Sequence, residues 1–182
     1  EPDWTFDPDE LSRAFSNRTR AIVINSPNNP TGKVFTRAEL ELIAELCQRW
    51  DVLAISDEIY ERIVYSESTH VPMASLPGMA DRTITTNGLS KTYSVTGWRM
   101  GWALSPASLT GGIRKMHDFL TIAAPSPFHD AGVTALRLPE QYYSDLNGEY
   151  QKKRDLMMDI LARHGFPADR KSTRLNSSHG YI

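Results

Sequence analysis

The 182-residue sequence contains a single cysteine, Cys47, and no long apolar run. One cysteine cannot form an internal disulfide, which argues against a small disulfide-bonded secreted domain and leads us to expect a reducing, cytoplasmic location. No apolar stretch approaches the roughly 20 residues that a membrane-spanning helix needs. Cys47 follows Leu40 and Ile43 at helical spacing, which predicts a small core residue and not a nucleophile.

An excess of charge of either sign is also absent, because 20 Lys and Arg residues face 22 Asp and Glu residues. The net charge of -2 indicates neither a nucleic-acid partner nor a membrane-surface partner. The sequence lacks G-x-G-x-x-G and G-K-[ST], so neither a dinucleotide site nor a P-loop is predicted. The five histidines have no partners at metal-ligand spacing, and no metal site is predicted.

What the sequence does contain is an alternation of short apolar strands and amphipathic helices. Ala21–Ile24 and Val52–Ser56 are predicted strands, and a capping box at Thr36 and Glu39 starts a helix between them. Strand, helix and strand over about 35 residues predict a βαβ unit. Further strands are predicted at 83–86 and 100–104. The expected fold class is α/β, with three layers and a mostly parallel sheet between flanking helices.

Four more helices are predicted from their start signals. Asp7 is the expected N-cap of the first, with Glu10 completing a capping box. Ser105-Pro106 is read as a cap followed by a first-turn proline, for a helix running to about Leu120. Another helix follows Pro125. Pro139 opens a long one, which Asn147-Gly148 is expected to bend and which ends near His164-Gly165.

The two ends of the sequence differ from the rest. Residues 169–182 are polar without an apolar period, and they resemble the translation of a common sequencing adapter. We therefore expect this segment to be a non-native tail and exclude it from the fold. The chain begins at Glu1 and not at Met, and we expect it to be a segment of a longer protein.

Polar side chains follow three of the predicted strands, at the point where each strand ends. Asn29 follows the first, Asp57 and Tyr60 follow the second, and Lys91 follows the third. Ligands of open α/β sheets bind outside the carboxyl ends of the strands. Taken singly, Asn29 is also consistent with a turn residue, Asp57 with a helix cap and Tyr60 with a core aromatic. Their shared position at strand ends predicts a common site.

The segment around Lys91 indicates which ligand this site would take. An arginine, Arg99, follows eight positions after Lys91 across a Ser-, Thr- and Gly-rich stretch. A lysine amine can form a Schiff base with an aldehyde. An arginine fork suits a phosphate better than a lysine does. Pyridoxal phosphate (PLP) carries both groups, and we therefore predict it as the cofactor.

Three motifs resemble those of a known family. Asn-Asn-Pro-Thr-Gly at 28–32, Ser-Asp-Glu-Ile-Tyr at 56–60 and Leu-Ser-Lys-Thr-Tyr-Ser-Val-Thr-Gly-Trp-Arg-Met-Gly at 89–101 resemble the fold-type I, class I/II PLP-dependent aminotransferases. With Met-His-Asp-Phe-Leu-Thr at 116–121, the match is most similar to the kynurenine/methionine aminotransferase-like branch. The resemblance runs from about Phe6 to Phe166.

The resemblance implies a role for each predicted site residue. Lys91 would form the Schiff base with PLP and later move a proton between the substrate Cα and the cofactor C4′. Asp57 would pair with the pyridine nitrogen, so that the ring draws electrons from the reacting carbon. Asn29 and Tyr60 would hydrogen-bond the ring 3-oxygen, and Arg99 would bind the phosphate.

The resemblance also implies an activity and a domain arrangement. Residues 1–168 would form part of the large domain, with the helix from about residue 139 leading toward a small domain. The intact enzyme would be a homodimer that transfers an amino group from an amino acid to a 2-oxo acid. A PLP-dependent β-lyase on the same scaffold is one alternative reading. A truncated fragment without catalytic activity is another.

The sequence departs from the family pattern in several places, among them the upstream phosphate-binding turn and the aromatic that stacks on the ring, which are both absent. The position three before the lysine is often Ser, whose hydroxyl reaches the phosphate, and here it is Gly88. The arginine that would bind the substrate carboxylate is not identified. Arg137 and Arg163 lie in helical patterns and are expected to be solvated.

Overall fold

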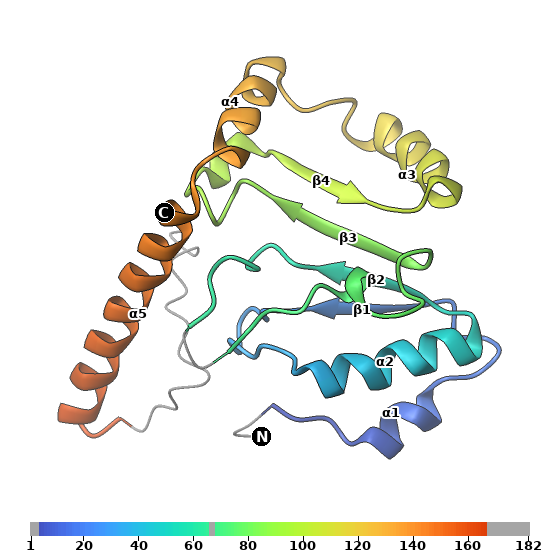
Figure 1. The fold of residues 1–182 in the computed structure, drawn as a ribbon, viewed down its shortest axis with the longest axis horizontal. Coiled ribbons are helices and arrows are strands. Elements are labelled where there is room, and N and C mark those ends of the chain that lie inside the picture. Colours follow the sequence, from blue (N-terminus) through green and yellow to red (C-terminus); the bar gives the residue numbers. More distant parts are fainter. Residues whose placement is uncertain (1–3, 66–67, 167–182) are drawn as a thin grey trace.

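A computed structural model describes residues 4–65 and 68–166 of the chain (Figure 1). Strands and helices alternate through the first half, and three helices make up the second half. In chain order the elements are α1 (Pro8–Ala14), β1 (Ala21–Asn25), α2 (Arg37–Trp50), β2 (Leu53–Asp57), the 3-10 turn η1 (Met73–Ser75), β3 (Thr83–Gly88), the 3-10 turn η2 (Thr96–Trp98), β4 (Gly101–Leu104), α3 (Ala107–Leu120), α4 (Ser126–Leu136) and α5 (Glu140–Arg163).

The four strands form one sheet in the order β1-β2-β3-β4. The pairs β1–β2 and β2–β3 are parallel, whereas β4 runs antiparallel to β3, as the opposed arrow in Figure 1 shows. The register aligns Asn25 with Asp57 and Asp57 with Thr86. The carboxyl ends of the three parallel strands therefore lie along one edge. The predicted α/β class with a mostly parallel sheet and flanking helices is confirmed.

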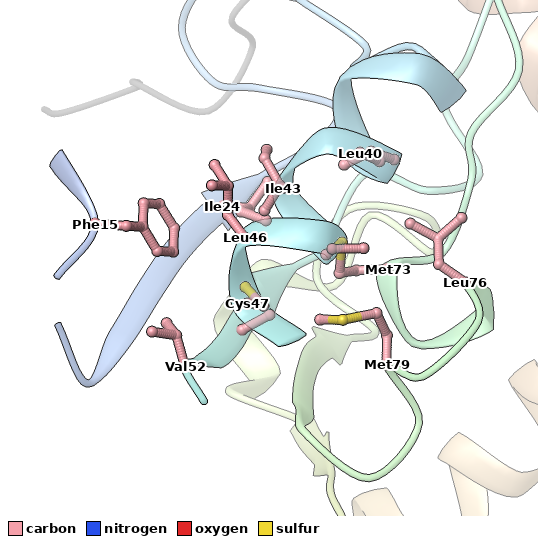
Figure 2. Close-up of a cluster of buried hydrophobic side chains, with 12 residues drawn as sticks. Phe15, Ile24, Leu40, Ile43, Leu46, Cys47, Val52, Met73, Leu76 and Met79 are labelled. Atoms are coloured by element: carbon pink, nitrogen blue, oxygen red, sulfur yellow. The ribbon is translucent and has the colours of Figure 1, made fainter. Parts of the chain in front are cut away.

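The hydrophobic core lies between one face of the sheet and α2 (Figure 2). Side chains alternate across a strand, so Ile24 is buried toward α2 while its neighbour Val23 is 73% exposed on the opposite face. Cys47 is fully buried in this core, as predicted. Burial raises the pKa of its thiol to about 11, although the nearby charge of Arg82 opposes the shift.

The start of α2 has the geometry that its sequence predicts. The Thr36 hydroxyl accepts from the Glu39 amide, and the Glu39 carboxylate accepts from the Thr36 amide, which completes the capping box. Lys33 adds an ion pair to the same carboxylate at 2.5 Å. At α1 only half of the predicted capping box forms. The Asp7 side chain accepts from the Glu10 amide, but among the described residues the Asp7 amide does not donate to the Glu10 side chain.

Two details of the later helices differ from the prediction. Pro106, and not Ser105, is the N-cap of α3, because its ψ of 149° is extended and helical geometry begins only at Ala107. The Ser105 hydroxyl instead pairs with that of Thr110 at 2.9 Å. Helix α5 continues unbroken through Asn147-Gly148, where a bend was expected.

Helix α5 passes the edge of the sheet at which β1, β2 and β3 end (Figure 1). It ends at Arg163 with His164 as the C-cap, and Gly165 follows with a φ of 75°, as predicted for a helix stop. Among the described residues, no helix has both the length and the apolar character needed to cross a membrane. The predicted non-native tail, 169–182, lies outside the described residues.

Candidate functional site

The turn after β1 is organised by Asn25, the last residue of that strand. Its side-chain amide donates to the main-chain oxygen of Asp57 at 3.1 Å. Its side-chain oxygen accepts from the main-chain amide of Asn29 at 2.8 Å. Asn25 therefore holds Asn29 beside the end of β2. The sequence analysis did not single out Asn25, although its position as the last strand residue before a turn-rich segment was a usable signal.

Asn29 and Tyr60 are in direct contact. The side-chain amide of Asn29 donates to the phenol oxygen of Tyr60 at 3.3 Å. Tyr60 is buried, with 3% of its surface exposed, and Asn29 is half-buried. The structure therefore brings together two of the predicted site residues, which lie at the ends of neighbouring parallel strands.

Asp57 is the last residue of β2 and is half-buried. Alternation places its side chain on the face opposite Ser56, and therefore opposite α2. One carboxylate oxygen accepts from the Ile59 amide at 3.2 Å, so Asp57 also caps the turn that leads to Tyr60. The other oxygen accepts no hydrogen bond from the described residues. The carboxylate thus keeps acceptor capacity for a ligand at the strand end.

Lys91 lies in the turn that follows β3. Its ammonium is 5.8 Å from the centre of the Tyr60 ring, within the range of a cation–π contact. The turn is closed by the bonds from the Tyr93 amide to the Leu89 oxygen, at 3.2 Å, and from the Ser94 amide to the Lys91 oxygen, at 3.3 Å. An amine, a phenol and an amide therefore lie close together at the carboxyl edge of the sheet.

Gly88, which ends β3, is required by the close approach of β4. A Cβ at this position would lie 2.6 Å from the Met100 oxygen and 3.0 Å from the Gly101 Cα. Both of these neighbours are backbone atoms and cannot rotate away. In this fold a Ser at position 88 would force β4 to shift, so the departure from the family pattern has a structural reason.

Arg99, like the Asp57 carboxylate, is a predicted site residue that the described contacts do not connect to Asn29, Tyr60 or Lys91. It follows η2 with a left-handed φ of 54°, and its guanidinium donates to the Thr96 oxygen at 3.3 Å. It is exposed. Within the described residues, no contact joins Arg99 to Lys91 or Tyr60. Its role as a phosphate ligand stays a prediction.

A buried polar cluster next to the site was not anticipated. Glu58 is 2% exposed, and one of its carboxylate oxygens accepts from the Ser56 hydroxyl at 2.8 Å and the Met73 amide at 3.1 Å. The other oxygen is 3.1 Å from His70 Nε2. With Glu61, these groups bring three possible metal-ligand atoms within 4.8 Å of one another. Both carboxylate oxygens of Glu58 thus have partners, and the cluster ties the loop at residues 70–73 to the end of β2.

Comparison with known proteins places these motifs in a family. The family model described as aminotransferase class I and II matches residues 1–175. Kynurenine–oxoglutarate transaminase 3 of Mus musculus is 46% identical over 166 residues, which cover 87% of this chain and 36% of the relative. Kynurenine–oxoglutarate transaminase 1 of Homo sapiens is 41% identical over 169 residues, covering 89% of this chain and 40% of the relative.

Solved structures have the same fold over nearly the whole chain. N-succinyldiaminopimelate aminotransferase from Mycobacterium tuberculosis matches with a TM-score of 0.90 and 37% identity, over 95% of this chain and 45% of that one. A Thermus thermophilus aspartate aminotransferase double mutant matches with a TM-score of 0.83 and 33% identity, over 92% of this chain and 44% of that one. The chain spans 36% to 45% of the length of these relatives. It belongs to the class I and II aminotransferase family.

Proposed function

We propose that the protein containing this chain binds PLP through Lys91 and transfers an amino group from an amino acid to a 2-oxo acid. The observation that carries the proposal is the meeting of the Asn29 amide, the Tyr60 phenol and the Lys91 ammonium at the ends of three parallel strands. Membership of the aminotransferase family supports the same reaction. The proposal covers amino acids and 2-oxo acids as chemical classes, because no described contact distinguishes one amino acid or one 2-oxo acid from another.

The residues present fit the cofactor in their chemistry. When bound, PLP supplies an aldehyde that reacts with amines and a pyridine ring that takes up electrons from the reacting carbon. In this proposal the Lys91 amine would hold the cofactor through its aldehyde and would move a proton between the substrate Cα and the cofactor C4′. Asn29 and Tyr60 would donate hydrogen bonds to the ring 3-oxygen. The hydrogen bond between their side chains orients both groups before the cofactor binds.

Asp57 and Arg99 have charge-based roles in the proposal. The Asp57 carboxylate, with one oxygen not engaged by the described residues, would hold a proton on the pyridine nitrogen. The Arg99 guanidinium would bind the phosphate, for which its planar fork of donors is suited. Arg99 is exposed, and within the described residues its guanidinium donates to the Thr96 oxygen of its own turn.

The first experiment tests the attachment residue. The protein is incubated with PLP, reduced with borohydride and digested, and the labelled lysine is identified by mass spectrometry. We expect the label on Lys91, with its loss in Lys91→Ala and its retention in Lys115→Ala, which changes an exposed lysine of α3. A folded chain labelled only at other lysines, or not labelled, contradicts the proposal.

The second experiment tests the reaction in a longer protein that contains this chain. Amino acids and 2-oxo acids are supplied in pairs, and the products are separated and identified. A new amino acid together with a new 2-oxo acid is the expected result. Release of pyruvate and ammonia would instead identify a β-lyase.

We also propose that two copies of the intact enzyme associate. Helix α3 has no buried residue among those described, and the side chains at its carboxyl end are strongly exposed. Phe119 is 84%, Leu120 78% and Ile122 80% exposed, which is unusual for a contiguous apolar group on a monomer. Sedimentation of the intact protein, with Phe119→Ser as the weakened variant, tests this association.

A cytoplasmic location completes the proposal. Its support is the single cysteine of this chain, which is free and buried in the core, as is usual for proteins of reducing compartments. Cell fractionation followed by detection of the protein tests the location.

A further inference from the structure

Three tyrosines outside the proposed cofactor contacts surround the turn that carries Lys91. Tyr142 and Tyr143 lie in the first turn of α5, and Tyr93 lies two residues after Lys91. We propose that Tyr143 is a positioning residue, which fixes the Lys91 turn relative to the segment that follows Tyr60. The inference rests on the proposed function, because the turn is held in place for the lysine amine.

On one side, α5 holds the Lys91 turn by two hydrogen bonds. The hydroxyls of Tyr93 and Tyr143 are 2.8 Å apart, and the Tyr142 hydroxyl donates to the Thr92 oxygen at 2.9 Å. The Tyr93 and Tyr142 rings stack with centres 5.7 Å apart. Thr92 is 4% exposed and Tyr143 is 7% exposed, whereas their partners Tyr142 and Tyr93 are half-buried, so each bond is partly shielded from water. The residues directly after Lys91 are thus fixed to α5.

On the other side, the same turns of α5 hold the segment after Tyr60. The Arg62 guanidinium lies 4.6 Å from the centre of the Tyr143 ring and 3.7 Å from the Glu140 carboxylate. One turn further along, the Asn147 side-chain oxygen accepts from the Val64 amide at 3.3 Å. Tyr143 therefore contacts both segments: its hydroxyl binds the Lys91 turn, and its ring binds the segment after Tyr60.

The chemistry of the tyrosine pair suits a fixed contact. Burial raises the pKa of Tyr93, and the bond to Tyr143 raises it further, so the Tyr93 hydroxyl stays protonated at neutral pH. It can therefore keep its hydrogen bond with Tyr143, in which the two hydroxyl oxygens are 2.8 Å apart, when the pH changes around neutrality. The bond is suited to holding the Lys91 turn in place.

The test compares Tyr93→Phe, Tyr143→Phe and the double variant, each of which keeps the rings and removes only hydroxyls. Tyr150→Phe, on the same helix, is the matched control. Amide hydrogen exchange is measured over residues 89–95. Each single variant is expected to exchange roughly 3- to 10-fold faster, as for the loss of one hydrogen bond. The double variant is expected to add little, because both changes remove the same bond.

A second measurement connects the turn to the lysine. The rate at which PLP labels Lys91 is measured after reduction with borohydride, and the labelling rate of Lys115 is the internal reference. In Tyr143→Phe we expect the Lys91 rate to fall while the Lys115 rate stays constant, and the circular dichroism per bound cofactor to decrease. If Tyr143→Phe does not fold, Tyr93→Phe replaces it, because it removes the same hydrogen bond and leaves the Tyr143 side chain unchanged.

The outcomes separate the two proposals. The positioning role is overturned if residues 89–95 exchange at the wild-type rate in Tyr143→Phe. It is also overturned if Lys91 is labelled in the wild-type protein and Tyr143→Phe changes neither the labelling rate nor the dichroism. Either result leaves the proposed function standing. Failure to label Lys91 in the folded wild-type protein overturns the proposed function, and with it the positioning role. Faster exchange together with slower Lys91 labelling supports both.

Discussion

The side-chain amide of Asn29 donates a hydrogen bond of 3.3 Å to the phenol of Tyr60, across a separation of 31 residues. The bond joins the turn after β1 to the turn after β2. It forms because the register pairs Asn25 with Asp57, and because the Asn25 side chain holds Asn29 at that end of the strands. Parallel pairing thus converts two distant motifs into one polar contact.

Removal of the Tyr60 hydroxyl is expected to weaken PLP binding. Tyr60→Phe loses the partner of Asn29 and one proposed donor to the cofactor, which predicts about 3- to 10-fold weaker binding for each hydrogen bond lost. Equilibrium dialysis with PLP measures the change, with Tyr150→Phe as the control. An unchanged affinity in Tyr60→Phe would place the phenol outside the cofactor contacts.

Addition of a methyl group at Gly88 is expected to destabilise the fold. Its Cβ would meet the Met100 oxygen at 2.6 Å, and overpacking of this kind costs about 1–3 kcal/mol. Gly148→Ala is the matched control, because a Cβ there meets nothing within 4 Å and helix propensity predicts a gain of about 1 kcal/mol. Urea unfolding of the two variants should show opposite signs. Equal stability of Gly88→Ala and wild type would refute the close approach.

The ion pair at the start of α2 is expected to make stability depend on pH in the acid range. Burial opposes ionisation of Glu39, but the hydrogen bonds from Lys33 and Thr36 outweigh it and hold the pKa of the carboxyl below its ordinary 4.5. A lowered folded pKa means that the contribution is complete above pH 4.5 and is lost as the pH falls through the folded value.

Denaturant unfolding at a series of pH values tests this contribution. Glu39→Gln should be less stable than wild type at pH 6, and the two stabilities should converge toward pH 3. Glu41→Gln is the control, because Glu41 is an exposed partner of Arg37 in the same helix and should change little. A Glu39→Gln deficit that does not shrink in acid would assign the effect to the cap alone.

Cys47 is expected to be unreactive in the folded chain. Burial raises its pKa to about 11, so very little thiolate is present at neutral pH, and the side chain is fully buried. A thiol reagent at pH 7.5 should label Cys47 only in denaturant, where one thiol per chain should react. Rapid labelling of the native protein would show that the core opens readily.

Local signals in the sequence were sufficient for the strands, for the α2 capping box and for the stop of α5. These features depend on residues within a few positions of one another, such as Thr36 with Glu39 or His164 with Gly165. The start of α3 was wrong by one residue, because the sequence pattern does not reveal the ψ of Pro106. Arg99 shows a similar limit, since its eight-residue spacing from Lys91 does not specify where its guanidinium points.

The sequence by itself determined which chemical groups lie at the strand ends, because a strand and the turn that follows it are recognised from residues that are neighbours along the chain. Tertiary structure alone decided which of these groups meet, and that β4 approaches closely enough to require Gly88. It also decided that Glu58 is buried with His70 and that Tyr143 contacts both the Lys91 turn and Arg62. Such contacts join residues far apart along the chain, and their distances follow from strand register and helix packing, which no short stretch of sequence specifies.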